Sequence, residues 1–211
     1  WNMKFTHLHT HSHYSLLQAL PKIPELVGAA KSRGMEALAL TDNGNLYGAI
    51  EFYKECKKVG VKPIIGVDFY VALRSRHDKQ AGVDKDRTRL VLLAKNEAGY
   101  KNLLKLVTYS HLEGFYYKPR IDSELLQKYS EGLVAVSSAW SGDISTSLRN
   151  KNSEQALDLL LRYKKTFGED FFIEITKHPE IAGHDAHMKS LYDFAKSNKA
   201  PITASHDVYY L

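Results

Sequence analysis

The sequence predicts an α/β protein built on a largely parallel sheet, either a βα barrel or a doubly wound sheet. Strand-length apolar runs recur seven times along the chain, and helical patterns lie between most of them. Most runs are continuous rather than alternating, which is typical of strands covered on both faces. Polar residues follow the expected strand ends. The number of strands favours a barrel that is incomplete relative to the usual βα barrel.

The expected strands occupy residues 4–9, 36–41, 63–72, 89–94, 132–137, 171–176 and 201–205. Apolar residues at helical spacing predict helices over residues 22–34, 46–60, 97–112, 154–168 and 184–199. In the first helix, Ile23, Leu26, Val27 and Ala30 share one face, and Gly34 ends the helix. The stretch RSRHDKQAGVDKDR, residues 74–87, is rich in charge without such spacing, so we expect a charged surface loop.

Length and composition limit the class of protein. The 211 residues suffice for one large domain or two small ones, and 44% apolar with 25% charged residues is ordinary for a globular chain. The net charge of +5 permits a nucleic-acid partner without requiring one. No apolar run is long enough to cross a membrane. The single Cys56 excludes an internal disulfide framework, so we expect a cytoplasmic location.

Polar side chains follow the expected strands where each strand ends. They comprise His9, His11, Asp42, Asn43, Asp68, Ser137, Ser138, His178, His206 and Asp207. Barrels of the βα type build their sites at the carboxyl ends of the strands. The regular placement of these residues therefore predicts a functional site at one end of the sheet.

The stretch FTHLHTHSHYS, near the start of the chain, is dense in histidine. In an extended segment His7, His9 and His11 share one face because side chains alternate. Alternate imidazoles can reach one metal ion or two adjacent ions. Solvated histidines at a polar strand end are the simpler interpretation of this motif alone, whereas the strand-end acids Asp68 and Asp207 favour an ancestral metal site.

Longer stretches of the chain resemble a known family. The chain is similar to the PHP (polymerase and histidinol phosphatase) domain in FTHLHTHSHYSLLQAL, LALTDNGNLYGAIEFYKECKKVGVKPIIGVDFYVA, LVLLAKNEAGYKNLLKL, GFYYKPRID and SHDVYYL. TDNGNLYGAIEFY, AKNEAGYKNLLKL and GFYYKPRID resemble in particular the branch at the N-terminus of bacterial DNA polymerase III alpha subunits. The resemblance covers nearly the whole chain, in order.

This resemblance implies a distorted seven-stranded, TIM-like βα barrel with residues 1–211 as a single domain, at the N-terminus of a longer polymerase chain. Active family members hold a trinuclear cluster of divalent metals and hydrolyse phosphoesters. In the polymerase branch, intact sites are associated with 3′–5′ exonuclease activity. Such metals polarise the phosphoryl group and lower the pKa of a bridging water. The implied cofactor is a divalent metal such as Zn, Mn, Fe or Mg.

Only part of the family's ligand set is present. The resemblance retains four candidate ligands, which are His9, His11, Asp68 (where the family has Glu) and Asp207. Five ligand positions instead carry Gln18, Asn43, Arg89, Ala139 and Tyr209. Neutral amides bind transition metals poorly, and alanine does not bind them. We therefore expect no full trinuclear cluster, and a single-metal site stays open as an alternative.

Arg89 is the most informative of these replacements. A guanidinium is always protonated, so in a cation cluster it would repel the metals that it replaces. We expect Arg89 to pair with Asp68 or Asp207 and to supply the positive charge of a lost metal ion.

Three extra histidines, His13, His178 and His206, lie near the same strand ends. Each is a possible replacement for a lost ligand. Adjacent residues of a strand point to opposite faces, so His206 and Asp207 are not expected to share one ion.

The stretch FYYKPR, residues 115–120, has two interpretations. It is an aromatic and basic patch for single-stranded DNA, or a loop that packs on the barrel. We prefer packing, with Lys118 and Arg120 reaching toward phosphate or the strand-end acids.

These observations favour the PHP domain of a DNA polymerase III alpha subunit, with a degenerate metal site and a mainly structural role in DNA replication. The implied partners are the rest of the polymerase chain, the proofreading subunit or other replisome proteins, and DNA through the parent polymerase, with no membrane. Two alternatives stay open. One is an active metal-dependent phosphoesterase, either an exonuclease or a histidinol-phosphatase-like enzyme. The other is a stand-alone DNA-binding module, which only the net charge of +5 supports.

Overall fold

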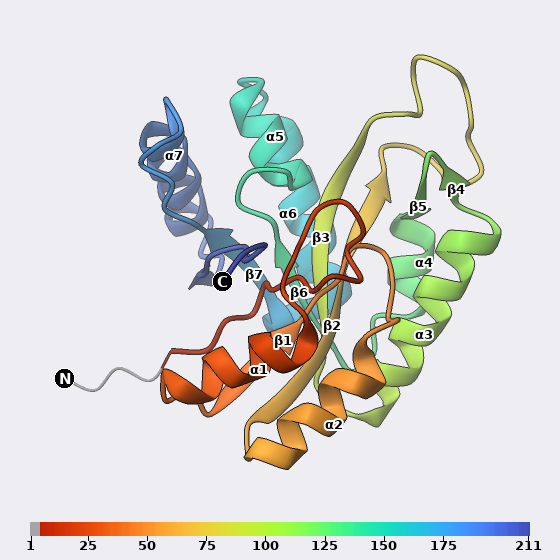
Figure 1. The fold of residues 1–211 in the computed structure, drawn as a ribbon. Helices are drawn as coiled ribbons and strands as arrows, with labels where there is room; N and C mark the ends of the chain where they lie inside the picture. Colours follow the sequence, from red (N-terminus) through yellow and green to blue (C-terminus); the bar gives the residue numbers. More distant parts are fainter. Residues whose placement is uncertain (1–4) are drawn as a thin grey trace.

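The computed structural model describes residues 5–211, which form one curled, mixed sheet with helices packed outside it (Figure 1). The strands are β1 Ala37–Leu40, β2 Lys62–Ala72, β3 Arg87–Ala94, β4 Phe115–Tyr116, β5 Lys118–Ile121, β6 Leu133–Ser137, β7 Phe171–Ile175 and β8 Ile202–Ala204. The helices are α1 Ile23–Ser32, α2 Ala49–Val59, α3 Glu97–Leu112, α4 Ser123–Lys128, α5 Asp143–Arg149, α6 Ser153–Phe167 and α7 His184–Ser197, with a 3-10 turn, η1, at Gly168–Asp170. Among these residues, no helix is both long and apolar enough to span a bilayer.

The strands lie in the order β4-β5-β2-β3-β6-β7-β8, and β1 also pairs with β2. Strands β1 and β5 share one edge of the long β2, with β1 on residues 62–65 and β5 on residues 70–71. The pairs β1–β2, β2–β5, β6–β7 and β7–β8 are parallel. The α/β class and six of the seven expected strands are confirmed.

Strand β3 departs from the expected parallel arrangement, because it runs antiparallel to both β2 and β6. The chain returns from β2 to β3 through residues 73–86, which contain no helix. A parallel neighbour needs a longer crossover, usually helical, whereas a direct return makes an antiparallel pair. This connection projects beyond the sheet at the top of Figure 1.

The expected first strand, residues 4–9, is wrong for the residues that the structure describes, and Lys4 lies outside them. Residues 5–9 form no regular strand. They run beside β1, where the Ala39 amide donates to the carbonyl of His7 at 2.9 Å. On their other side the Val208 amide donates to the carbonyl of His9 at 3.0 Å. This irregular segment therefore lies between β1 and the chain that follows β8.

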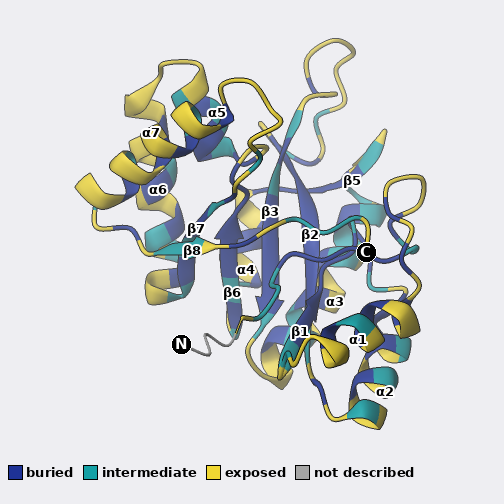
Figure 2. Cartoon of the chain, turned by 60° about the vertical axis from the view of Figure 1, so that its left-hand side comes forward, coloured by how far each residue is buried: buried dark blue, intermediate teal, exposed yellow. Residues whose placement is uncertain are grey.

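Two apolar clusters hold the helices on the sheet. Strands β2, β3, β6 and β7 are largely buried, whereas the helices expose their outer sides (Figure 2). Helix α1 contributes Ile23, Leu26, Val27 and Ala30 to a second cluster with β1 and α2, as the helical spacing predicted. The packing keeps the strand frame fixed while leaving the carboxyl ends of the strands to carry polar side chains.

The segment 115–121 forms a hairpin, β4–β5, rather than a loop. Phe115 and Tyr117 stay largely exposed, whereas Arg120 is buried. The Arg120 guanidinium donates to four backbone carbonyls, those of Gly114, Arg76, Asp78 and Asp84, at 2.9–3.0 Å. Arg120 therefore fastens the 73–86 connection, and the expectation that it reaches the strand-end acids is wrong.

The 73–86 connection is less loose than its composition indicated. Arg74 pairs with Asp84 at 2.6 Å, and the Arg76 guanidinium pairs with Asp122 at 3.0 Å. Arg76 and Asp84 are both buried. Charge in this stretch thus serves internal ion pairs as well as solvation.

Candidate metal centre

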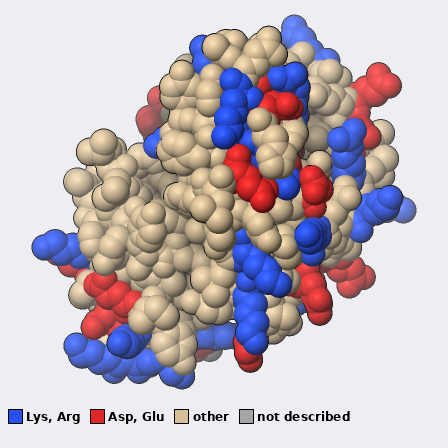
Figure 3. All heavy atoms as spheres, turned by 90° about the vertical axis from the view of Figure 1, so that its right-hand side faces the viewer, with Lys and Arg blue, Asp and Glu red and all other residues tan. Residues whose placement is uncertain are grey.

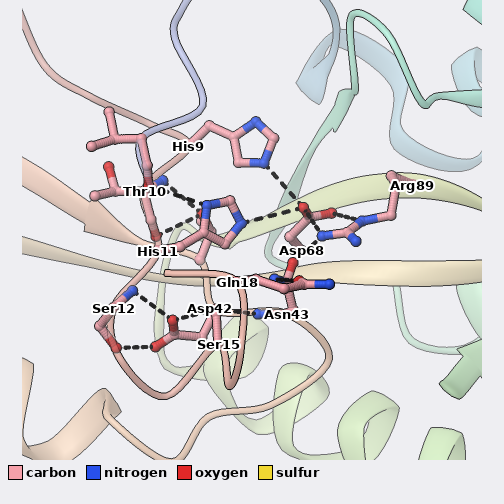
Figure 4. Close-up of polar contacts among 12 residues, drawn as sticks. His9, Thr10, His11, Ser12, Ser15, Gln18, Asp42, Asn43, Asp68 and Arg89 are labelled. Carbon is pink, nitrogen blue, oxygen red and sulfur yellow. Dashed lines mark hydrogen bonds and ion pairs between the residues drawn. The ribbon is translucent and has the colours of Figure 1, made fainter. Parts of the chain in front are cut away.

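The carboxyl end of β1, the middle of β2 and the irregular segment 7–11 meet at one place (Figure 4). The Asp68 amide donates to the Asp42 carbonyl at 3.2 Å, and the Gly44 amide donates to the Asp68 carbonyl at 2.9 Å. Gly44 has a φ of +65°, and a side chain there would meet Pro119 at 2.9 Å. Glycine allows this backbone conformation, so the chain can turn away from β2 next to the point where Asp68 faces the histidines.

Three of the four retained candidate ligands come together. The Nε2 atoms of His9 and His11 lie 3.1 Å and 3.4 Å from Oδ2 of Asp68. All three residues are buried, and their ligand atoms lie within 4.8 Å of one another. The distances alone would allow these three residues to hold a metal ion.

A positively charged side chain, that of Arg89, contacts this group of three residues. The Nε of Arg89 donates to Oδ1 of Asp68 at 3.0 Å, and its Nη2 donates to Oδ2 of the same carboxylate. In the β2–β3 pairing, Arg89 lies opposite Tyr70, and its guanidinium stands 4.4 Å from the centre of that ring. Of the two acids expected as partners of Arg89, the structure selects Asp68.

The replaced ligand positions contact one another. The Asn43 side chain donates to Oε1 of Gln18 and accepts from Nη2 of Arg89. A continuous hydrogen-bonded chain thus runs from Gln18 through Asn43 and Arg89 to Asp68 (Figure 4). The network therefore leads from the exposed Gln18 through the partly buried Asn43 and Arg89 to the buried Asp68.

The other two replaced positions also adjoin this centre. The Tyr209 ring stacks on the His11 ring, with centroids 4.1 Å apart and an interplanar angle of 6°. Ala139 is buried, and its amide donates to Oε2 of Glu174 at 3.0 Å. Neither side chain offers an ordinary metal ligand atom in this position.

Glu174 is a site residue that the sequence did not reveal. It lies in β7 and is buried. Its Oε1 lies 3.0 Å from Nδ1 of His9 and also accepts from the hydroxyl of Ser205. The available signal was a single acid inside the apolar run FFIEI.

Asp42, which the sequence indicates only as a polar residue at a strand end, anchors the loop that follows the histidines. Its carboxylate accepts from the amide and hydroxyl of Ser12 and from the hydroxyl of Ser15, each at 2.7 Å. The Ser15 hydroxyl in turn accepts from the Asn43 amide at 3.0 Å. Asp42 therefore positions residues 12–15 and does not face the Arg89 pair.

Burial and charge together set the protonation of the centre. Burial opposes the charge on His9, but Glu174 and Asp68 outweigh it and raise the pKa of His9 to about 10. Burial lowers the pKa of His11. Burial opposes the charge on Asp68 as well, yet Arg89 and the two histidines hold the pKa of Asp68 well below its usual range. The centre therefore holds a carboxylate between a guanidinium and an imidazolium.

These residues do not fit the metal cluster that the family implies. Both oxygens of Asp68 accept hydrogen bonds from Arg89. A histidine ligates a metal through a free ring nitrogen, whereas both ring nitrogens of His9 face carboxylate oxygens, Nδ1 that of Glu174 at 3.0 Å and Nε2 that of Asp68 at 3.1 Å. The cation that contacts Asp68 in this structure is the Arg89 guanidinium.

Asp207, the fourth retained candidate, lies elsewhere. It joins His178 and His206 in a second group whose ligand atoms lie within 4.8 Å of one another. The expectation that His206 and Asp207 would not share an ion assumed that both lie on a strand. This premise is wrong, because β8 ends at Ala204 and the alternation of side chains does not apply beyond it. His13 belongs to neither group among the described residues.

Lys118 also stays away from the acids. Its ammonium lies 5.8 Å from the centre of the Tyr70 ring, on β2. Across residues 5–211, no ion pair joins Lys118 to a carboxylate. A role as a partner of the strand-end acids is therefore not supported.

A cavity of about 580 Å³ adjoins both groups. His9, Asp68 and Glu174 line it together with His178 and Asp207. Cavities of this size are typical of small-molecule sites. The cavity places the second group beside the Arg89 centre without a shared ligand.

Comparisons with known proteins agree with this fold. The chain is 47% identical over 209 residues to DNA polymerase III subunit alpha of Borreliella burgdorferi and 42% identical over 213 residues to that of Treponema pallidum. Each alignment covers 99% of this chain and 18% of the relative, so the chain spans about a fifth of the length of the curated relatives it matches.

Solved structures show the same fold at low identity. One is an amidohydrolase from Chromobacterium violaceum, with a TM-score of 0.62 and 14% identity, over 97% of this chain and 87% of the other. Another, from Bifidobacterium adolescentis, is assigned as a metal-dependent phosphoesterase, with a TM-score of 0.63 and 13% identity, over 98% and 88%. The sequence pattern of the PHP domain matches residues 7–178. The chain belongs to the PHP domain family.

Proposed function

We propose that the chain is the PHP domain of a DNA polymerase III alpha subunit, in which an arginine-centred network has replaced the metal cluster and the domain serves a structural role. The alpha subunits at 47% and 42% identity support the polymerase context. The partners in this proposal are the remainder of the polymerase chain and replication proteins such as the proofreading subunit. DNA is reached through the parent polymerase, in the cytoplasm.

The Arg89–Asp68 pair carries this proposal. A metal cluster stabilises its site by bringing positive charge to converging carboxylates and imidazoles. Arg89 brings a permanent positive charge to the same carboxylate, through hydrogen bonds from two of its nitrogens. Gln18 and Asn43 extend the network from neighbouring segments. The residues around the cluster position thus stabilise one another without an ion.

In this proposal, an irregular segment rather than a regular strand closes the barrel. The segment 7–11 is hydrogen-bonded to β1 on one side and to Val208 on the other. We propose that these contacts complete a distorted, TIM-like ring in place of a regular first strand. The histidines would then lie where the barrel closes, and their contacts would hold the two ends of the sheet together.

An assay of phosphoester hydrolysis tests the proposal. The purified chain would be incubated with 3′-labelled DNA and with p-nitrophenyl phosphate, with Mg²⁺, Mn²⁺, Zn²⁺ or Fe²⁺ in turn. We expect no turnover above that of a His9→Ala variant. Turnover that His9→Ala abolishes would contradict the proposal.

An active metal-dependent phosphoesterase is the second candidate. The convergence of His9, His11 and Asp68 and the adjoining cavity of about 580 Å³ favour it. The Arg89 guanidinium on Asp68 weighs against it, because a metal cluster would have to form beside a fixed positive charge. The assay above separates the two candidates.

A stand-alone DNA-binding module has less support. Binding without sequence preference needs a basic patch or groove that follows the phosphate backbone. On the face shown in Figure 3, Lys and Arg are interspersed with Asp and Glu. Strongly salt-dependent DNA binding by the isolated chain would favour this third candidate.

A further inference from the structure

We propose that His178, His206 and Asp207 form a mononuclear site for a divalent transition metal, with Zn²⁺ as the preferred ion. The three residues follow β7 and β8, at the carboxyl ends of these strands. None of them contacts Arg89, and none belongs to the His9–His11–Asp68 group. This site is independent of the proposed structural role and adds an ion-binding function to the domain.

The geometry is close to that of one coordination sphere. The Nε2 of His178 lies 3.4 Å from Oδ1 of Asp207, and the ligand atoms of all three residues lie within 4.8 Å of one another. Two ligand atoms of a tetrahedral Zn²⁺ site are about 3.4 Å apart when each bond is about 2.0–2.1 Å. The distance between the ligand atoms of His178 and Asp207 therefore already has the required length, and the other two distances do not exceed 4.8 Å.

A nearby carboxylate fixes the orientation of His178. Its Nδ1 lies 3.0 Å from Oε1 of Glu180. A carboxylate only accepts, so Nδ1 carries the proton, and in the neutral ring Nε2 presents a lone pair. Metal-binding histidines commonly donate their other ring nitrogen to such a carboxylate, which sets the tautomer.

This arrangement leaves two acceptors facing each other. The Nε2 of His178 and Oδ1 of Asp207 both carry lone pairs across 3.4 Å. A proton or a cation between them removes the repulsion. His206 adds a second imidazole beside this pair, since its ring stacks on His178 with centroids 4.6 Å apart, and a metal ion can use both imidazoles.

His184 supports the loop that carries the first ligand. Its Nδ1 accepts from the backbone amide of His178 at 3.4 Å, and its Nε2 lies 3.1 Å from the hydroxyl of Thr176. Its ring stacks on Trp140 at 5.4 Å. His178 is therefore held by neighbours on both its backbone and its ring, as expected of a preorganised ligand.

The donor set selects the class of ion. Two imidazoles and one carboxylate suit Zn²⁺ and similar transition metals, whereas Mg²⁺ and Ca²⁺ prefer sites made of oxygen atoms. The side chains of His178 and Asp207 are 18% and 35% exposed, and both residues line the cavity. A fourth coordination position is thus open to water or to a small anionic ligand.

Zinc titration tests this site. The untagged chain would be stripped with a chelator, dialysed and titrated with Zn²⁺ by calorimetry, with bound zinc counted by elemental mass spectrometry. We expect one Zn²⁺ per chain. His178→Ala, His206→Ala and Asp207→Asn should each weaken binding at least about 100-fold, and Glu180→Gln about tenfold. Substitution with Co²⁺ should give the visible absorption of a low-symmetry site, lost in His178→Ala.

Matched controls separate this site from the Arg89 centre. His77→Ala removes an exposed histidine outside the site, and His9→Ala removes a candidate ligand of the other group. His77→Ala should bind Zn²⁺ as the unaltered chain does, and folded His9→Ala shows whether any bound zinc depends on the other group. No bound zinc, or zinc that is kept in folded His178→Ala and in folded His9→Ala alike, would overturn this site alone. Zinc that is lost only in His9→Ala would overturn it and the proposed structural role together.

Discussion

The Nε of Arg89 donates to Oδ1 of Asp68 across 3.0 Å, and the Asp68 side chain is only 2% exposed. The pair joins β3 to β2 in the part of the sheet where the two strands run antiparallel. An ion pair in such surroundings contributes little beyond its desolvation cost while it is intact, but breaking it leaves one buried charge alone.

Arg89→Met should therefore destabilise the chain by about 3–5 kcal/mol. The matched control is Arg87→Met, which removes an arginine two residues earlier on the same strand. Arg87 contacts the Tyr70 ring at 5.4 Å but pairs with no acid among the described residues. We expect the control to cost about 1 kcal/mol or less. Urea unfolding measures both, and equal losses would contradict the pairing.

Restoring ligands should restore metal binding at this centre. The double variant Arg89→His with Asn43→His removes the guanidinium and adds two imidazoles beside His9, His11 and Asp68. We expect it to bind at least one ion more than the unaltered chain, as counted by elemental mass spectrometry. The control Arg89→Gln with Asn43→Gln adds no ligand, and a similar gain there would show that the positive charge alone mattered.

Stability should fall as the pH rises above neutrality. The pKa of His9 is raised from 6.5 to about 10 in the folded chain. Its contribution to stability is therefore complete below about pH 6.5 and is lost as the pH rises through 10, because the folded state binds one more proton than the unfolded state in that interval. The slope reaches about −1.4 kcal/mol per pH unit.

Urea unfolding at pH 7, 8 and 9 measures this slope, and His9→Gln should flatten it. Direct titration of His9 by NMR gives the same quantity independently. A His9 that titrates near its ordinary pKa would refute the assignment of an imidazolium between Glu174 and Asp68.

Arg120 should control the order of the 73–86 connection. Arg120→Met removes donors to four backbone carbonyls and should destabilise the chain by about 2–4 kcal/mol. It should also speed hydrogen exchange and proteolysis within residues 73–86. Lys118→Met, two residues away on the same short strand, should change neither. Unchanged exchange in the Arg120 variant would show that other contacts hold the connection.

Much of the fold could be read from continuous apolar runs, because burial on both faces leaves a clear signal. The first strand could not, since residues 5–9 hold their place through backbone hydrogen bonds to Ala39 and Val208. The direction of β3 is not encoded in its apolar composition. The absence of a helical pattern in residues 74–87 was the one feature of the sequence that indicated an antiparallel β3.

The site was predictable where it follows the family pattern and less so where it depends on distant contacts. Arg89 was expected on an acid, and the structure identifies Asp68. The sequence did not indicate Glu174 as a site residue because its partner, His9, is 165 residues away in sequence. His206 and Asp207 can converge because the strand ends at Ala204, so the alternation of side chains along a strand does not apply to them.

The central claim is that Arg89, rather than a metal cluster, neutralises the carboxylate between His9 and His11. The most direct measurement is the metal content of a folded His178→Ala chain, loaded with Zn²⁺, Mn²⁺ or Fe²⁺ and then desalted. We predict no stoichiometric ion, because the second group is disabled and the first is held by Arg89. One or more ions per chain that disappear when His9→Ala is added would contradict the claim.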